Sequence, residues 1–284
     1  MRLTWCALFL FSASLEAAEP PLRFAIADSW TMPAIEVEGD QPTDGILFDT
    51  MNSLARHLGT PAQFHVLARA RVQNAMAQGE VDVRCYAAQA WLPNLSGDYL
   101  WSVPLFIQRN LLVSTHPEPS AVNLQQLSRQ HIGTVLSYTY TPLQPLFDTN
   151  QLIRDDARNE EQVLQKLVVG RYRYAIASQW TLDWFNKTQA TGNPLYSVAV
   201  LQEQAVGCYV RNDPRVPAQR ILRTLLRMKM SGEIDASSSV TSAPRTTLSL
   251  PTSPRPEARR FAMPAVAQSC APNPAPPRRA LAAQ

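Results

Sequence analysis

The chain has 284 residues, 45% of them hydrophobic and 17% charged, and a formal net charge of +3. Such an apolar fraction can form the core of one large domain or of two smaller ones. The positive charge is concentrated in residues 236–284, which carry six Arg against one Glu, so the rest of the chain sums to about −2. A basic nucleic-acid-binding surface is therefore excluded for that rest.

An N-terminal secretory signal peptide is predicted for residues 1–18. A positive charge precedes an apolar run at residues 3–11, and small residues lead to a cleavage site after Ala17 or Ala18. The run is shorter than the roughly 20 residues that a membrane-spanning helix needs. Cys6 lies inside the run and not directly after it, so we do not expect a lipid anchor. These features predict a soluble protein of the periplasm.

Short apolar runs and Gly-containing turns alternate in the first part of the chain. We predict strands at residues 22–27, 63–67 and 80–85, and helices from the turn at 44–49 to Leu58 and from Val72 to Gln78. Gly79 closes the second helix and leads directly into the third strand. Alternation of strands and helices is typical of an α/β fold.

The second part of the chain repeats this pattern. We predict strands at 111–114, 131–136 and 171–177, helices at 123–129, at 160–169 and from Pro142 onward, and a return through strand 205–210 to a last helix at 216–230. Thr141 is the expected cap of the helix at Pro142. Gly170 repeats the helix, Gly, strand step of Gly79, which indicates two similar lobes.

The order and spacing of these elements resemble family 3 of the bacterial extracellular solute-binding proteins. The resemblance is carried by the Asp44-Gly45-Ile46-Leu47-Phe48-Asp49 turn into the first helix and by the step from Gly79 to Asp82. It implies an α/β fold with two lobes, of the type II periplasmic-binding-protein architecture, and a hinge that the chain crosses twice. Lobe I would comprise residues 22–106 and 204–235, lobe II residues 107–203, and the hinge would lie near 106–110 and 200–204.

The resemblance implies a periplasmic receptor that captures a small polar or anionic solute and presents it to the membrane permease of an ABC-type transporter. Such a protein would be a monomer without a cofactor. Two alternatives stay open: a catalytic descendant of the same fold, dehydratase-like or peptidoglycan-cleaving, and a ligand-sensing protein that docks on a membrane sensor kinase. The sequence has no Gly-x-Ser-x-Gly motif, phosphate-binding Gly loop or zinc-binding spacing, so we predict neither an enzyme nor a metal site.

Relatives that bind amino acids hold the ligand carboxylate with an Arg that follows the third strand. They hold its ammonium with a carboxylate at the end of the strand that follows the second Gly step. These positions fall at Asn94 and Ser178 in this chain. Because neither residue carries the required charge, we do not expect a zwitterionic amino acid to be held in that manner.

Arg84 is the most unusual residue of the predicted cleft. It lies near the end of a strand that should be covered on both faces, where an unpaired charge costs several kcal/mol. Asp28, at the end of the neighbouring first strand, is its expected ion-pair partner, and direct contact with the ligand is the alternative. Arg69 follows the second strand, where its guanidinium could stack on a ligand, bind an anion or simply be solvated.

Aromatic side chains are concentrated at predicted strand ends and in the loops that follow them. Such rings suit a cleft because they bury a large area at little cost in entropy. Ser137, Thr139 and Gln179 could add neutral hydrogen bonds. The candidate ligand-binding residues are Asp28, Trp30, Arg69, Arg84, Tyr86, Trp91, Ser137, Tyr138, Thr139, Ser178 and Gln179.

The resemblance also implies a disulfide between Cys85 and Cys208, because the strands that carry them are sheet neighbours in the family and an exported protein meets an oxidising compartment. Two buried thiols are the alternative, and Cys270 would remain unpaired. Cys270 belongs to residues 236–284, where nine prolines and no apolar period predict disorder. We interpret that segment as a natural low-complexity tail or as the product of a shifted reading frame.

Overall fold

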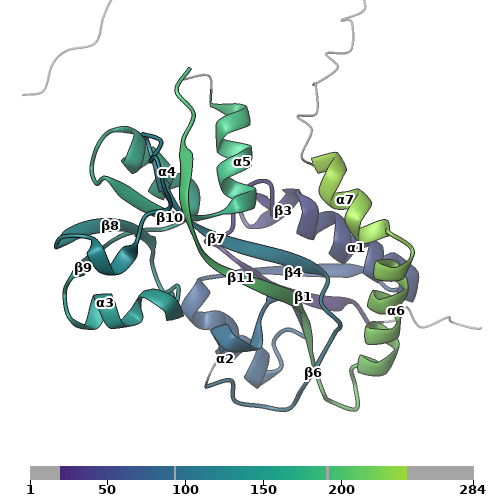
Figure 1. Ribbon diagram of the computed structural model, residues 1–284. Coiled ribbons are helices and arrows are strands. Elements are labelled where there is room, and N and C mark those ends of the chain that lie inside the picture. The colour runs from purple at the N-terminus through teal and green to yellow at the C-terminus, as the bar shows by residue number, and fades with distance from the viewer. Residues whose placement is uncertain (1–19, 93, 190–191, 242–284) are drawn as a thin grey trace, which may run out of the picture. The chain divides into compact units, whose positions relative to one another are not determined.

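The computed structural model describes residues 20–92, 94–189 and 192–241, which form an α/β structure (Figure 1). Its strands are β1 (Leu22–Ala27), β2 (Glu36–Glu38), β3 (Gln41–Asp44), β4 (Ala62–Leu67), β5 (Val83–Ala87), β6 (Tyr99–Trp101), β7 (Phe106–Ser114), β8 (Gln130–Val135), β9 (Leu152–Ala157), β10 (Tyr174–Ser178) and β11 (Tyr196–Arg211). Its α-helices are α1 (Ile46–Leu58), α2 (Val72–Gln78), α3 (Gln144–Asp148), α4 (Glu160–Val168), α5 (Gln179–Thr188), α6 (Ala218–Met230) and α7 (Glu233–Thr241). None of these described helices has the length and apolar character of a membrane span.

The main sheet has the strand order β4-β1-β5-β11-β7-β10-β8-β9, and β6 also pairs with β11. In lobe I, β1 lies parallel to β4 and β5. In lobe II, β8 lies parallel to β9 and β10. Each lobe therefore has its own group of parallel strands, and the two groups flank the antiparallel strands β7 and β11. The predicted two-lobed α/β architecture is confirmed.

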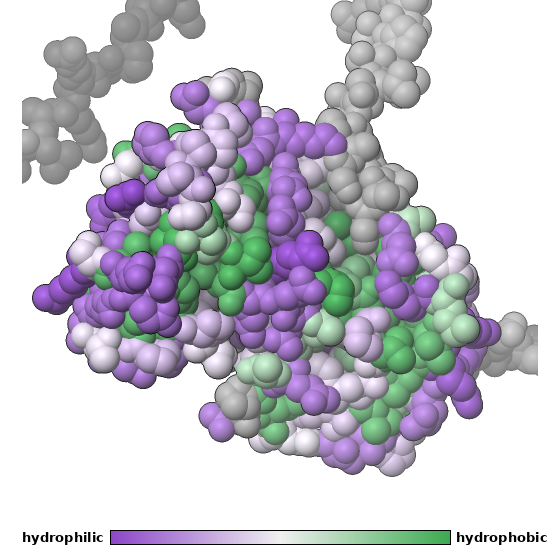
Figure 2. All heavy atoms as spheres, in the orientation of Figure 1, coloured by the Kyte–Doolittle hydropathy of each residue, from purple (hydrophilic) through white to green (hydrophobic). Residues whose placement is uncertain are grey.

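Strands β7 and β11 run together from one lobe to the other (Figure 1). Because they pair along the whole of β7, the two predicted crossings at residues 106–110 and 200–204 lie side by side in one antiparallel ribbon. Hydrophilic side chains lie at the middle of the face shown in Figure 2, with apolar side chains on either side. Arg109 and Glu203 form an ion pair across the ribbon at 2.6 Å with about half of each side chain exposed. The ion pair lies within the predicted crossings, whereas the ends of the ribbon contribute buried residues to the cores, such as Leu112 in lobe II and Val206 in lobe I.

Alternation along the strands places side chains in cores on both faces of each lobe. In β1, Phe24 and Ile26 pack against α1 and α6, whereas Ala25 packs against α2 on the opposite face. In β10, Ala175 packs with α4 and α5, and Ile176 packs with α3. Helices thus cover the faces of the strands, and the carboxyl ends of the strands remain for a binding site.

The two glycine turns that carried the resemblance occupy backbone conformations that favour glycine. Gly45 has a φ of 118°, and a side chain at this position would collide with the backbone of Ala34 and Ile35. Gly79 has a φ of 74° and ends α2, with its amide donating to the carbonyl of Met76. Both turns therefore depend on glycine for a steric reason.

Two predicted features of lobe II are wrong in detail. The helix expected at residues 123–129 is only the 3-10 turn η3 (Leu124–Gln126), because Leu127 adopts an extended backbone and packs against the core around α3. Thr141 does not cap the next helix. The chain enters α3 through the turn η4 (Thr141–Leu143) after Tyr140, whose hydroxyl accepts a hydrogen bond from the Val135 amide at 2.9 Å.

A disulfide joins Cys85 on β5 to Cys208 on β11 inside lobe I. The two strands pair antiparallel, and both sulfur-bearing residues are fully buried. This bond closes a loop that contains all of lobe II, since the two residues are 123 positions apart. The predicted signal peptide at residues 1–18 and Cys270 lie outside the described residues.

Helix α7 shows that the predicted boundary at Asp235 is wrong, because the helix continues to Thr241. Its first turn is tied to α1, where Ser53 and His57 both hydrogen-bond the carboxylate of Glu233. Ile234 is fully buried in the core of lobe I. The rest of the predicted tail, residues 242–284, lies outside the described residues.

We expect two truncations to distinguish the contribution of α7 to stability from that of the segment that follows it. A chain that ends at Thr241 should melt at the same temperature as the full chain. A chain that ends at Met230 loses the buried Ile234 and the Glu233 contacts, which together contribute about 3 kcal/mol, so its melting temperature should fall by roughly 6–12 °C. Circular dichroism melts of the three proteins test this, and equal melting temperatures would show that α7 contributes nothing to the core.

Candidate ligand-binding site

A cavity of about 60 Å³ lies between the two lobes, where the loops after β1, β4, β8 and β9 meet the ends of β5 and β10. Space of this size holds only a few water molecules. Ligands of open α/β sheets bind at such carboxyl strand ends. The lining residues are Ser29, Trp30, Thr31, Ala34, Arg69, Arg84, Tyr86, Trp91, Gln108, Asn110, Tyr138, Thr139, Tyr140, Glu160, Ser178 and Thr181.

Arg84 on β5 supplies a buried positive charge to this cavity. The residue is 3% exposed, and its Nε and Nη1 atoms have no hydrogen-bond partner among the described residues. Its guanidinium lies 5.5 Å from the ring centre of Trp30. Burial, together with a smaller effect of the neighbouring charge of Arg69, lowers the pKa of Arg84 to about 10. The guanidinium therefore stays protonated at neutral pH without a carboxylate beside it.

The predicted ion pair between Asp28 and Arg84 is wrong. The strands β1 and β5 are neighbours as expected, but Asp28 lies beyond the end of β1 and is exposed. Its carboxylate turns toward the loop after β4 and accepts a hydrogen bond from the Arg69 amide at 3.2 Å. This contact supports the turn η1 (Arg69–Arg71), and no ion pair joins Asp28 to Arg84 among the described residues.

The loop after β8 carries Tyr138 across the cavity to lobe I. Ser29 donates a hydrogen bond to the Tyr138 hydroxyl at 3.2 Å, and the Arg69 guanidinium lies 5.9 Å from the Tyr138 ring centre. Two features hold this loop in place. Arg154 donates to the carbonyls of Val135 and Tyr138, and Ser137 adopts a left-handed backbone with a φ of 63°. Burial raises the pKa of Tyr138 to about 12, so its hydroxyl is neutral.

Aromatic side chains from both lobes pack around Tyr86, which lines the cavity. Tyr86 stacks on Trp180 of α5 with ring centres 5.1 Å apart, and it meets Trp30, Trp91 and Phe106 edge-on. Tyr86 itself has a φ of 57°, a conformation that is rare for a bulky side chain. The stack of Tyr86 on Trp180 is a direct contact between lobe I and lobe II.

Glu160 supplies a buried negative charge that the sequence analysis missed. It lies in the first turn of α4, is 8% exposed, and accepts hydrogen bonds through Oε2 from the Ser178 amide at 3.0 Å and the Ser178 hydroxyl at 2.6 Å. An acidic residue in the first turn of a helix normally indicates only a favourable interaction with the helix dipole. The sequence pattern therefore held no signal that distinguished Glu160 from an ordinary surface residue.

Eight of the eleven predicted site residues meet in this cavity. Those that line it are Trp30, Arg69, Arg84, Tyr86, Trp91, Tyr138, Thr139 and Ser178. Asp28, Ser137 and Gln179 do not line it. The amide of Gln179 donates to Asp183 along α5 at 2.7 Å, and the exposed Ser137 serves as a turn residue. Among the residues with described positions, no cluster of His, Cys, Asp or Glu is arranged to hold a metal ion.

Neither a protein-family model nor a curated protein matches this sequence. Solved structures match it in fold. An ancestral arginine-binding protein bound to arginine is 17% identical with a TM-score of 0.63, covering 78% of this chain and 97% of its own. The GluR0 ligand-binding core in complex with L-glutamate is 14% identical with a TM-score of 0.64, covering 79% and 99%.

A histidine kinase sensor domain with similarity to periplasmic binding proteins is 16% identical with a TM-score of 0.63, and the match covers 78% of this chain and 96% of that domain. The described part of the chain thus has the two-lobed fold of the periplasmic binding proteins. The resemblance inferred from the sequence is confirmed at the level of this fold.

Proposed function

We propose that the protein is a periplasmic solute-binding protein whose two lobes close on a small anionic solute, and that a carboxylate of this solute pairs with Arg84. The observation that carries this proposal is the buried guanidinium of Arg84, which faces the cavity with two nitrogen atoms unpartnered among the described residues. A buried charge without a partner costs several kcal/mol. A carboxylate that accepts charge-assisted hydrogen bonds from this guanidinium would recover this cost.

The surroundings of Arg84 support a small organic ligand. Arg69 adds a second positive charge to the cavity wall, and the rings of Trp30 and Tyr138 offer flat apolar surfaces beside both guanidinium groups. Such a mixture of apolar walls and a few convergent polar groups is typical of small-molecule sites. We place delivery to an ABC-type permease first. Docking on a sensor kinase is the second candidate, favoured by the likeness to a histidine kinase sensor domain.

The test begins with a thermal-shift screen of the exported protein against monocarboxylates, dicarboxylates, amino acids and polyamines. We expect compounds with a carboxylate to raise the melting temperature, whereas polyamines without a carboxylate should not. The amide of each hit is the matched control, because it removes the charge and keeps the shape. A screen in which no carboxylate raises the melting temperature, or in which amides act equally well, would contradict the proposal.

Small-angle scattering then tests closure of the lobes. The cavity of about 60 Å³ is lined by Tyr86 and Tyr138, and each contacts the opposite lobe, Tyr86 through Trp180 and Tyr138 through Ser29. A ligand must therefore enter while the lobes are apart. We expect a saturating hit to shift the equilibrium toward the closed form and reduce the radius of gyration. An unchanged radius at saturation would contradict a hinged receptor.

A further inference from the structure

Strand β5 contains a β-bulge in the part that lines the cavity. Arg84 lies opposite Tyr209 on β11. Ala87, three positions further along β5, lies opposite Gly207, which is only two positions away from Tyr209. One residue of β5 is therefore extra in the ladder between the two strands. Bulges of this kind change the direction in which side chains point, and they are frequent beside functional sites.

The extra residue is Tyr86. Cys85 is bonded to Cys208, and these two positions continue the register that Arg84 and Tyr209 begin. Tyr86 comes next, and its φ of 57° is the left-handed conformation in which a bulge normally carries glycine. A bulky residue adopts this conformation only where its surroundings hold it there.

The bulge brings Tyr86 to the face of the sheet that alternation would deny it. Val83 and Cys85 both belong to the core around α1 and α6, as expected for residues two positions apart. Strict alternation would turn Tyr86 to the opposite face, against α2. Tyr86 instead shares the core of Cys85, and Ala87 packs in the core around α2. On this face Tyr86 stacks on Trp180 of lobe II.

The disulfide ties β5 to β11 at the bulge. The Cys208 amide donates to the Ser102 hydroxyl at 2.9 Å, and the Cys208 carbonyl accepts from the Ser102 amide at 2.8 Å. Both backbone groups thus bond the residue after β6, and the sulfur–sulfur bond holds Cys85 opposite Cys208. Without this bond, β5 could slip by one position into the regular register, which would turn Tyr86 to the other face.

Tyr86, Trp180 and Phe106 form an aromatic contact between the lobes. The ring centre of Phe106, at the start of β7, lies 6.4 Å from that of Tyr86 and 5.3 Å from that of Trp180, and the rings of Tyr86 and Trp180 stack at 5.1 Å. Such ring pairs stabilise beyond the area that they bury. The contact exists while the lobes are together and is lost when they part, so it favours the closed form of the free protein.

We propose that the disulfide between Cys85 and Cys208 positions Tyr86 for this aromatic contact and thereby raises the share of free molecules whose lobes are closed. The two cysteines are positioning residues that act through Tyr86. This role is distinct from the stabilisation that any cross-link of a long loop provides. One consequence rests on the proposed function: a solute that binds the closed form would bind more tightly, because a larger share of the receptor is already in that form.

Small-angle scattering of the protein without ligand follows the share of closed molecules through the radius of gyration. Trp180→Ala removes the lobe II half of the contact and should increase the radius. Trp184→Ala is the matched control, because Trp184 lies one turn further along α5 and outside this group of rings, and it should keep the wild-type radius. Cys85→Ala combined with Cys208→Ala should increase the radius to the value of Trp180→Ala, and adding Trp180→Ala to the cysteine pair should cause no further increase.

A disulfide that only stabilises would give a different result. The cysteine-pair variant would then melt at a lower temperature and keep the wild-type radius, which would overturn the proposal. An unchanged radius for Trp180→Ala would also overturn it, as would a further increase when Trp180→Ala is added to the cysteine pair. Circular dichroism verifies that each variant is folded. Cys85→Val combined with Cys208→Ala, which fills more of the core, takes the place of the alanine pair should that pair not fold. Since no ligand is used, none of these outcomes bears on the proposed function, which the solute screen tests.

Discussion

Replacing Arg84 with Met should abolish the response to carboxylates and, at the same time, raise the melting temperature of the free protein. Loss of a charge-assisted contact in a desolvated site should weaken binding by about 100-fold or more, equivalent to roughly 3 kcal/mol. The stability should change in the opposite direction. The pKa of Arg84, lowered to about 10 mainly by burial, shows that the fold disfavours the charged form, and Met removes that charge while retaining an apolar stem.

The expected gain in stability is about 1–2 kcal/mol, since the contact with the Trp30 ring offsets part of the burial cost. For a chain of this size the gain corresponds to a rise of roughly 2–8 °C in the melting temperature. Arg71→Met is the control, because Arg71 is exposed in the same group of loops, and it should change neither quantity. A lower melting temperature for Arg84→Met would show that Arg84 stabilises the free protein, which would contradict a role reserved for binding a ligand anion.

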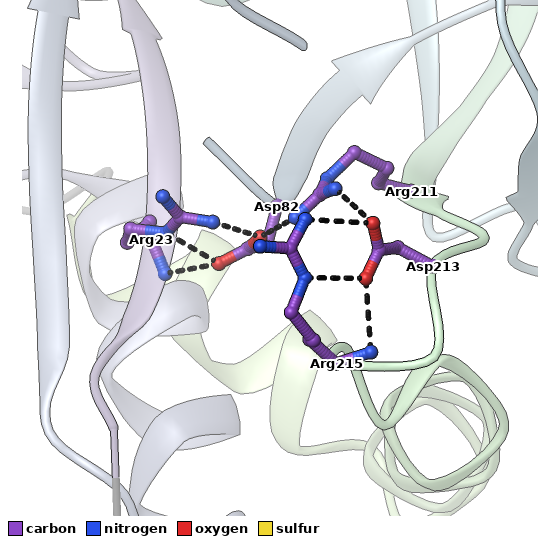
Figure 3. A network of polar contacts seen from close by, with 5 residues as sticks. All are labelled: Arg23, Asp82, Arg211, Asp213 and Arg215. Atoms are coloured by element: carbon purple, nitrogen blue, oxygen red, sulfur yellow. Dashed lines mark hydrogen bonds and ion pairs between the residues drawn. The ribbon is translucent and has the colours of Figure 1, made fainter. Parts of the chain in front are cut away.

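Replacing Asp82 with Asn should cause a large loss of stability without a direct effect on the cavity. Asp82 accepts hydrogen bonds from Arg23 at 2.6 and 2.8 Å and from Arg211 at 2.9 Å (Figure 3). Arg211 in turn donates to Asp213, which also binds Arg215. The network joins the starts of β1 and β5 to the end of β11, and none of its residues lines the cavity.

The Asp82 side chain is 7% exposed and that of Arg211 is 11% exposed, so an amide at position 82 leaves the guanidinium of Arg211 poorly compensated in a buried place. Removing one partner of such a pair costs about 3 kcal/mol or more, which lowers the melting temperature by roughly 6–12 °C. Glu203→Gln, which breaks the exposed pair with Arg109, is the control and should cost less than about 1 kcal/mol. Urea unfolding measures both losses of stability. Equal losses for Asp82→Asn and Glu203→Gln would contradict the stabilising role assigned to Asp82.

The contribution of Asp82 to the stability of the folded protein should depend on pH. Burial by itself would raise the pKa of its carboxyl, but the hydrogen bonds from Arg23 and Arg211 outweigh burial and hold the pKa below its ordinary value. A carboxyl whose pKa is depressed in the folded state stabilises the protein above its unfolded pKa, and this contribution is lost as the pH falls through the folded value. The difference in stability between wild type and Asp82→Asn should therefore be full at pH 7 and shrink below about pH 4.

The sequence by itself determined the order of the elements and the edge at which the site would form. Local signals carried this prediction: the glycine steps at Gly79 and Gly170 and the apolar runs that follow them. Such signals can be recognised without knowledge of the tertiary structure. Once alternating strands and helices are recognised, the carboxyl ends of parallel strands must meet at one edge. For this reason Trp30, Arg84 and Tyr138 could be assigned to one cavity although they lie far apart in the chain.

Only the tertiary structure decided which charges face that cavity. Asp28 directly follows β1 and Arg84 lies on the neighbouring strand β5, but the Asp28 carboxylate accepts its hydrogen bond from the Arg69 amide in the loop after β4. Glu160 and Glu161 are consecutive acids in one helix turn, and the packing of α4 against β10 buries the first beside Ser178 and leaves the second exposed. The direction of a side chain at a helix or strand end depends on the element that packs over it, and a local pattern does not contain that information.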